Sequence, residues 1–141
     1  RYLRLSHQKT YQQYLLNMVA ELEKLQMIDE GFRNRIIDRE KKQSTIFGGG
    51  IAFPHTINQG YAKTILMFGK LEEPYQKGDE WIEFIFLVAI PSEIERKMES
   101  ELLELYDDIF RIAGEPSLKE ALRAVETEIE FLSFSKSKGV F

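Results

Sequence analysis

The reactive chemistry of this sequence centres on one histidine that follows a run of glycines. The chain has two histidines and no cysteine. His7 stands in a polar, basic stretch, and we expect it to be a solvated surface residue. His55 directly follows Pro54, and residues 48–50 just upstream are three consecutive glycines. Because glycine lets backbone N–H groups approach an anion closely, this stretch has the residue types that a phosphoryl acceptor needs.

In that chemistry a neutral imidazole nitrogen attacks phosphorus, backbone amides hold the phosphoryl oxygens, and a nearby cation spreads the developing charge. The same residues also fit a plainer interpretation, in which His55 packs at the end of a strand beside a glycine turn. The residues alone leave both interpretations open.

Other chemistries find little support in the sequence. Without cysteine there is no disulfide scaffold, no thiolate zinc site and no cysteine nucleophile, and the composition suits a reducing cytoplasm. The glycines at 48–50 are not followed by the Gly-Lys-Ser/Thr of a phosphate-binding loop, and they lack the spacing of a dinucleotide-binding motif. No ligand spacing suggests a metal site and no serine-centred motif suggests acyl transfer. We therefore expect neither a metal nor a cofactor.

Length and charge limit the class of protein further. The 141 residues suit a single domain spanning 1–141. A net charge of −4 has the wrong sign for direct nucleic-acid contact. The longest apolar run, residues 84–90, is far shorter than the roughly 20 residues of a membrane-spanning helix, so we expect no membrane insertion. Because the chain starts at Arg1 and not at methionine, we expect a piece of a longer protein or a protein trimmed at its start.

The elements that must position His55 follow from hydrophobic periodicity. Apolar spacings of three and four predict helices at 11–25, 30–42 and 93–113, and capping boxes predict two shorter helices beginning at Ser117 and Thr127. Short strands are expected on either side of the glycines, and longer strands at 64–71 and 82–90. The last strand is apolar almost throughout, so it should lie in the middle of the sheet. These elements predict a three-layer α/β sandwich with helices flanking a sheet, and a tail that frays after Ser133.

Charged residues on the helices have a simple interpretation with one exception. The basic residues of the second helix are interrupted by acids and are interpreted as a solvated surface: Arg33, Arg35, Arg39, Lys41 and Lys42. Glu101, however, falls within the apolar stripe of the long helix, three residues after Met98 and four before Leu105. Its carboxylate lies either at the edge of that stripe, in water, or faces a polar site.

A resemblance to a known family sharpens these interpretations. The chain has Arg39-Glu40, then Ser44-Thr45, then Gly-Ile-Ala-Phe-Pro-His at positions 50–55. This arrangement closely resembles the active-site stretch of the type 2 (fructose/mannitol) enzyme IIA domains of the bacterial sugar phosphotransferase system, and the likeness extends from about residue 11 to 132. The family implies a mixed sheet between layers of helices and a histidine that the carrier protein HPr phosphorylates. It also implies transfer of the phosphoryl group to a cysteine of enzyme IIB.

The resemblance assigns roles to individual residues. His55 matches the phosphoryl acceptor, and Arg39 matches the arginine that neutralises the phosphoryl group, a role that suits a guanidinium fork. The phosphate pocket would be bordered by Ser44, Thr45, Gly49 and Gly50. Transport members of the family usually carry a second histidine on the long helix, and here the matching residue is Glu101, or Leu102 if the register slips by one. A carboxylate there could orient His55 but would repel a phosphoryl group, so we expect a less stabilised phosphohistidine.

Three functional hypotheses remain. Similar domains end multidomain bacterial transcription regulators and antiterminators, beside helix-turn-helix and PTS-regulation domains. The leading hypothesis is such a cytoplasmic regulatory domain, phosphorylated on His55 by HPr and docking with its sister domains. The second is a transporter's own enzyme IIA, which would act as a phosphotransferase towards enzyme IIB. The third is a domain that is not phosphorylated and only binds partners.

Overall fold

The centre of the molecule is a mixed sheet of six strands. The computed structural model describes residues 1–141, apart from the side chain of Phe47. The strands are β1 (Tyr2–Leu5), β2 (Ile46–Phe47), β3 (Ile51–Ala52), β4 (His55–Asn58), β5 (Ile65–Lys77) and β6 (Glu80–Pro91). The order is β1-β5-β6-β3-β2, with β4 also paired to β6. The β2–β3 and β5–β6 pairs are antiparallel, whereas the β1–β5, β3–β6 and β4–β6 pairs are parallel.

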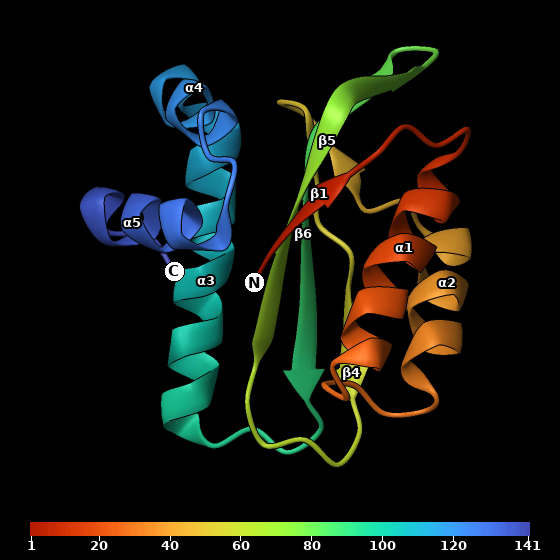
Figure 1. Cartoon of the computed structure of the whole chain (residues 1–141). Helices are drawn as coiled ribbons and strands as arrows, with labels where there is room; N and C mark the ends of the chain where they lie inside the picture. The colour runs from red at the N-terminus through yellow and green to blue at the C-terminus, as the bar shows by residue number, and fades with distance from the viewer.

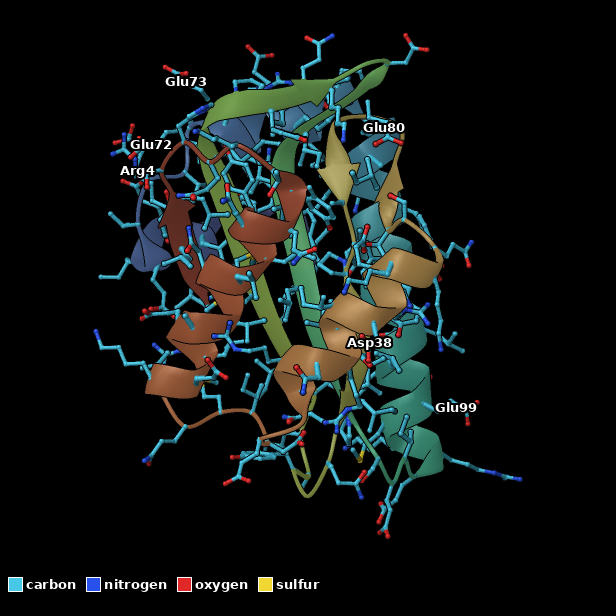
Figure 2. The ribbon with its side chains drawn as sticks, turned by 90° about the vertical axis from the view of Figure 1, so that its right-hand side faces the viewer. Arg4, Asp38, Glu72, Glu73, Glu80 and Glu99 are labelled. Carbon is cyan, nitrogen blue, oxygen red and sulfur yellow. The ribbon has the colours of Figure 1, made fainter. Side chains whose placement is uncertain are left out.

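Helices cover both faces of the sheet. They are α1 (Tyr11–Lys24), α2 (Phe32–Lys42), α3 (Arg96–Gly114), α4 (Pro116–Arg123) and α5 (Glu128–Lys138). The first two lie on one face and the last three on the other (Figure 1). Asp38 of α2 and Glu99 of α3 are exposed at the surface of the molecule (Figure 2). The predicted three-layer α/β sandwich is confirmed.

Strand β6 lies in the middle of the sheet and of the core, as its apolar run predicts. Its residues from Ile82 to Ile90 are all buried. Side chains such as Leu87 pack towards α1 and α2, while Phe84, Phe86 and Val88 pack towards α3, α4 and α5. A strand covered on both faces reads as a nearly continuous apolar run, which is why the sequence shows one there.

Two segments differ from expectation. The tail does not fray after Ser133, because α5 continues to Lys138 and Gly139 ends it with a φ of 66°. Phe134 and Val140 are buried against the sheet, and this burial holds the tail in place. The first residues, for which the sequence predicted no strand, form β1 at the sheet edge, where Arg4 pairs with Glu72 at 3.0 Å (Figure 2).

Strands β3 and β4 run end to end along the same side of β6. Ile51 is paired with Phe84, and four residues later His55 is paired with Val88. The break between the two strands falls at Phe53 and Pro54, and proline has no N–H for a continuous ladder. Among the described residues no further strand pairs with β4, and α2 packs against it instead. His55 therefore opens a short strand that meets a helix at its free side.

Within the part of the chain that the structure describes, no helix combines the length and the apolar run that crossing a bilayer requires.

Candidate functional site

The His55 ring is held by hydrogen bonds at both of its nitrogens. Nδ1 lies 2.9 Å from the carbonyl oxygen of Phe53. Because a carbonyl can only accept, Nδ1 carries the proton and Nε2 carries the lone pair. Nε2 lies 2.9 Å from Nη2 of Arg39, and the guanidinium donates to it. The pair of contacts selects one tautomer of a neutral imidazole, with Nε2 as the basic, nucleophilic atom.

The surroundings of His55 favour this neutral form. Burial of the half-buried ring lowers its pKa below the ordinary 6.5, and the nearby positive charge of Arg39 lowers it further. The hydrogen bond to Phe53 and the negative charge of Glu40 act in the opposite direction but do not outweigh burial. At neutral pH the ring therefore offers an unprotonated Nε2.

Arg39 and Glu40 point to two different parts of the site. Arg39 is exposed and reaches His55, whereas the Glu40 carboxylate accepts hydrogen bonds from the Thr45 backbone N–H, at 3.0 Å to Oε1, and from the Thr45 hydroxyl. Tyr11 Oη lies 3.1 Å from the Thr45 hydroxyl, and the Thr45 carbonyl accepts from the Phe53 N–H at 2.9 Å. The connection after α2 is thereby tied to the strand break that precedes His55.

These residues border a hollow of about 280 Å³. Its lining residues come from α2, the connection after it, β2, the strand break, β4 and α3: Arg39, Gln43, Ser44, Thr45, Ile46, Phe53, His55, Tyr106 and Phe110. The structure thus brings four predicted site residues, Arg39, Ser44, Thr45 and His55, into one pocket. The Ser44 hydroxyl accepts from the Ile46 N–H at 3.2 Å and so shapes the turn at the rim.

Two aromatic residues of α3 belong to the pocket although the sequence did not single them out. The Tyr106 ring centroid lies 5.9 Å from that of His55 and 4.8 Å from that of Phe53. Burial raises the pKa of the Tyr106 hydroxyl, and the charge of Arg39 partly opposes that shift. Tyr106 and Phe110 are four residues apart beside the buried Ile109, a spacing that places them on one side of the helix. This four-residue spacing of two aromatic residues is the sequence feature from which their place at the pocket could have been predicted.

Gly49 and Gly50 lie outside the lining of this pocket, contrary to expectation. Both have positive φ, of 83° and 79°, which favours glycine. A Cβ on Gly49 would lie 2.5 Å from the Ala113 carbonyl oxygen, and one on Gly50 would lie 2.7 Å from the Trp81 ring. The Gly50 carbonyl accepts from the backbone N–H of Glu83 at 2.8 Å. These glycines allow the turn to pack closely against α3 and β6.

Glu101 also lies apart from His55. It is exposed and lines a separate groove of about 770 Å³, together with Met98, Leu102, Leu105 and Phe141. Of the two interpretations of its place in the apolar stripe, the structure favours the edge, with the carboxylate in water. Tyr106 stands five residues further along α3, a rotation of about 140° around the helix axis, so the two residues lie on different sides of the helix and in different hollows.

A metal would need several ligands in one place. In the described part of the chain, no group of three or more histidine, aspartate or glutamate side chains is arranged to hold one. The arrangement at His55 can instead do nucleophilic chemistry on an anionic group, since it joins a neutral imidazole to a guanidinium.

The chain matches a described protein family over nearly its whole length. The family profile "Phosphoenolpyruvate-dependent sugar phosphotransferase system, EIIA 2" matches residues 3–138. A curated relative, "Transcriptional regulator ManR" of Bacillus subtilis, is 24% identical over 106 residues. That alignment covers 75% of this chain but 16% of ManR, so the chain spans about a sixth of the length of this relative.

Solved structures with the same fold include two bacterial proteins. The nitrogen regulatory protein IIA-Ntr of Neisseria meningitidis matches with a TM-score of 0.72 and 22% identity, covering 94% of this chain and 90% of that one. The complex of enzyme IIA-mannitol with phosphorylated enzyme IIB-mannitol from Escherichia coli matches with a TM-score of 0.72 and 18% identity, covering 96% and 93%. At these identities the likeness establishes the fold.

Proposed function

The chain belongs to the EIIA 2 family of the phosphoenolpyruvate-dependent sugar phosphotransferase system, and on that premise we propose that His55 is its phosphoryl acceptor. The observation that carries the proposal is the orientation of the ring. Nδ1 donates to the Phe53 carbonyl, so Nε2 keeps its lone pair and faces Arg39 at the pocket. Of the two histidines in the chain, His7 is exposed and does not line this pocket.

The reaction is an in-line transfer between two imidazoles. The Nε2 lone pair attacks the phosphorus of a phosphohistidine donor, and the donor's P–N bond breaks. The electron pair of that bond returns to the donor nitrogen, while a new bond forms between phosphorus and Nε2. The His55 Nδ1 proton stays in its hydrogen bond to Phe53, so its ring needs no proton transfer during the step.

In this scheme the Arg39 guanidinium occupies two positions, one before and one after the phosphoryl group arrives. In the unphosphorylated domain its guanidinium covers the Nε2 lone pair at 2.9 Å. The incoming phosphoryl group takes that place, and the exposed guanidinium then moves aside to pair with the phosphoryl oxygens. Ser44 and Thr45 border the space that those oxygens would enter.

We propose further that the domain regulates transcription in response to this phosphorylation. The support is the similarity to a relative named as a transcriptional regulator, over 75% of this chain. A phosphoryl group adds negative charge and strong acceptors to the pocket, which changes how a neighbouring domain can dock there. In this proposal HPr is the donor in the cytoplasm, and PTS-regulation and helix-turn-helix domains of a longer chain are the sister domains. A transporter-type enzyme IIA, passing phosphate to enzyme IIB, is the alternative.

The two histidines make a direct test possible. The protein is incubated with enzyme I, HPr and labelled phosphoenolpyruvate, and acid-labile label is measured. We expect label on the unaltered protein and on His7→Ala, and no label on His55→Ala. A folded His55→Ala variant that keeps its label, or an unaltered protein that takes none, overturns the assignment of His55.

A second step separates the two roles. Labelled domain is mixed with enzyme IIB proteins, and transfer of the label is followed over time. Rapid, complete transfer to a IIB cysteine supports the transport role, whereas label that stays on His55 supports the regulatory role.

A further inference from the structure

Two arginines of α2, one helical turn apart, contact nearby residues on the free side of β4. Arg39 Nη2 lies 2.9 Å from His55 Nε2, and Arg35 Nε donates to the carbonyl oxygen of Ile57 at 3.1 Å. Arg35 and Arg39 are four residues apart, so they share one side of the helix. His55 and Ile57 are two residues apart along the strand. The helix and the strand are therefore joined by two parallel contacts, only one of which involves the reactive ring.

The guanidinium of Arg35 is itself held in place. It forms an ion pair with the Asp29 carboxylate, which also accepts from the backbone N–H of Gln59 at 2.8 Å and of Gly31 at 2.9 Å. Burial alone would raise the pKa of Asp29, but the hydrogen bonds from Gln59, Arg35 and Gly31 outweigh it and lower the pKa. Asp29 is thus ionised and joins Arg35 to the residue that follows β4.

A buried amide completes the attachment. The Asn58 side chain is fully buried, and its Oδ1 accepts from the Asp29 N–H at 2.9 Å while its Nδ2 donates to the Met27 carbonyl at 3.0 Å. Met27 and Asp29 belong to the connection between α1 and α2. The start of α2 is therefore fastened to the end of β4, and Arg35 carries the attachment one turn further towards His55.

We propose that Arg35 is a positioning residue for His55: by bridging Asp29 and the Ile57 carbonyl, it sets the place on β4 at which Arg39 meets Nε2. The inference rests on the proposed role of His55. Arg39 is exposed, so the placement of α2 along the strand decides where its guanidinium can reach. A displacement of about 1 Å in such a contact is enough to slow a reaction by one or two orders of magnitude.

Arg33 provides a matched control on the same helix. It also forms an ion pair, with Glu23, but that contact joins α2 to α1 and does not involve β4. Lysine keeps the charge and the helix propensity at either position, but it lacks the fork that can hold a carboxylate and a carbonyl together. Arg35→Lys therefore removes the bridge between Asp29 and the Ile57 carbonyl. Arg33→Lys removes a guanidinium from the same helix without affecting that bridge.

The first readout is the titration of His55 followed by NMR at its ring Cε1–H. The charged groups near the ring are Arg39 and Glu40 from α2, and the titratable Tyr106 of α3 has its ring centroid 5.9 Å from that of His55; all three residues remain in both variants. Arg39 lowers the pKa of His55, so a retreat of Arg39 raises it. We expect an upward shift of the midpoint in Arg35→Lys and none in Arg33→Lys.

The second readout is the rate of phosphorylation by HPr. We expect Arg35→Lys to be on the order of tenfold slower than the unaltered protein, and Arg33→Lys to stay within about twofold of it. Circular dichroism and thermal unfolding check that both variants fold. A purely structural role for Arg35 would lower the unfolding temperature and leave the His55 midpoint where it was.

Gly31 offers an independent way to displace Arg35 without replacing it. A Cβ at Gly31 would lie 2.6 Å from Arg35 Nη1 and 3.3 Å from Asp29 Oδ2, so the guanidinium would have to shift. The Gly31 φ of −85° suits alanine. We expect Gly31→Ala to change both readouts in the same direction as Arg35→Lys, by a smaller amount.

An unchanged His55 midpoint in folded Arg35→Lys, or an equal shift in Arg33→Lys, overturns the inference. Because the titration needs no phosphoryl donor, it remains decisive even if His55 accepts no phosphate. If His55 is phosphorylated but its titration midpoint is the same in the unaltered protein and in Arg35→Lys, the proposed function stands and only the role of Arg35 is excluded.

Discussion

Two sides of α3 border two very different hollows. One side contributes Met98, Leu102 and Leu105 to a groove of about 770 Å³ with the acids Glu101, Glu104 and Asp108 among its lining. Another side contributes Tyr106 and Phe110 to the pocket of about 280 Å³ that contains His55 and Arg39. The larger hollow has neither an imidazole nor a guanidinium in its lining. In this molecule, volume does not indicate where the chemistry lies.

The difference comes from what meets the helix on the opposite side. Beside the Tyr106 side of α3, a strand break and the end of α2 bring a neutral ring and a cation to 2.9 Å from each other. Beside the side that carries Met98 and Leu102 lie residues of the segment before β5, such as Lys63 and Thr64. A single helix can therefore border a reactive pocket on one side and a groove of a different character on another.

Removing Arg39 from the smaller hollow is expected to have the largest effect on the phosphorylation rate. We expect Arg39→Ala to slow phosphorylation of His55 by about 100-fold, because a cation that stabilises charge in the transition state is lost. Arg39→Lys keeps a point charge without the fork and should lose less. The rates of phosphorylation by HPr measure both variants. An Arg39→Ala rate within a few-fold of the unaltered protein would contradict the role of the guanidinium.

Acid should slow the phosphorylation of His55, because it protonates the ring in the smaller hollow. Because the pKa of His55 is lowered from 6.5, neutral Nε2 persists to a more acidic pH than in an ordinary histidine. The rate should be level above the midpoint and fall about tenfold per pH unit well below it, since only the unprotonated ring attacks. The kinetic midpoint should coincide with the NMR midpoint of His55 and lie below 6.5. A midpoint above 6.5 would mean that burial and Arg39 do not control this ring.

The smallest effect is expected in the larger groove. Glu101→Gln should change the phosphorylation rate and the phosphohistidine lifetime by less than about twofold, because Glu101 is exposed and outside the His55 pocket. Tyr106→Phe, which alters a residue that does line the pocket, serves as the comparison. A phosphohistidine that lasts many times longer in Glu101→Gln would show that this carboxylate acts on the phosphoryl group after all.

Several features could be predicted from local pattern because local chemistry decides them. The apolar run at 84–90 predicted a central strand, and the periodicity before Lys24 predicted α1. The Arg39-Glu40 pair and the Pro54-His55 string identified the family, and the structure places Arg39 against His55. The roles of these residues in catalysis stay predictions until they are measured.

Features that depend on distant partners were harder to predict. Gly49 looks like a phosphate-binding glycine until the Ala113 carbonyl is found where its side chain would be. Arg35 looks like surface charge until the Ile57 carbonyl and Asp29 are found around it. Glu101 matched the position of a family histidine, but the residue of α3 beside the reactive ring is Tyr106.

Residue types and periodicity by themselves predicted the sandwich and its central strand, and they marked His55 as a candidate phosphoryl acceptor while a plainer interpretation stayed open. The sandwich and its strand could be predicted because hydrophobic patterning is a property of residues close together in the chain. Only the tertiary structure decided the partners of that histidine: the carbonyl that selects its tautomer, the guanidinium on its lone pair and the aromatic ring beside it. Such contacts depend on how the helices lie on the sheet and on which side of α3 faces the ring.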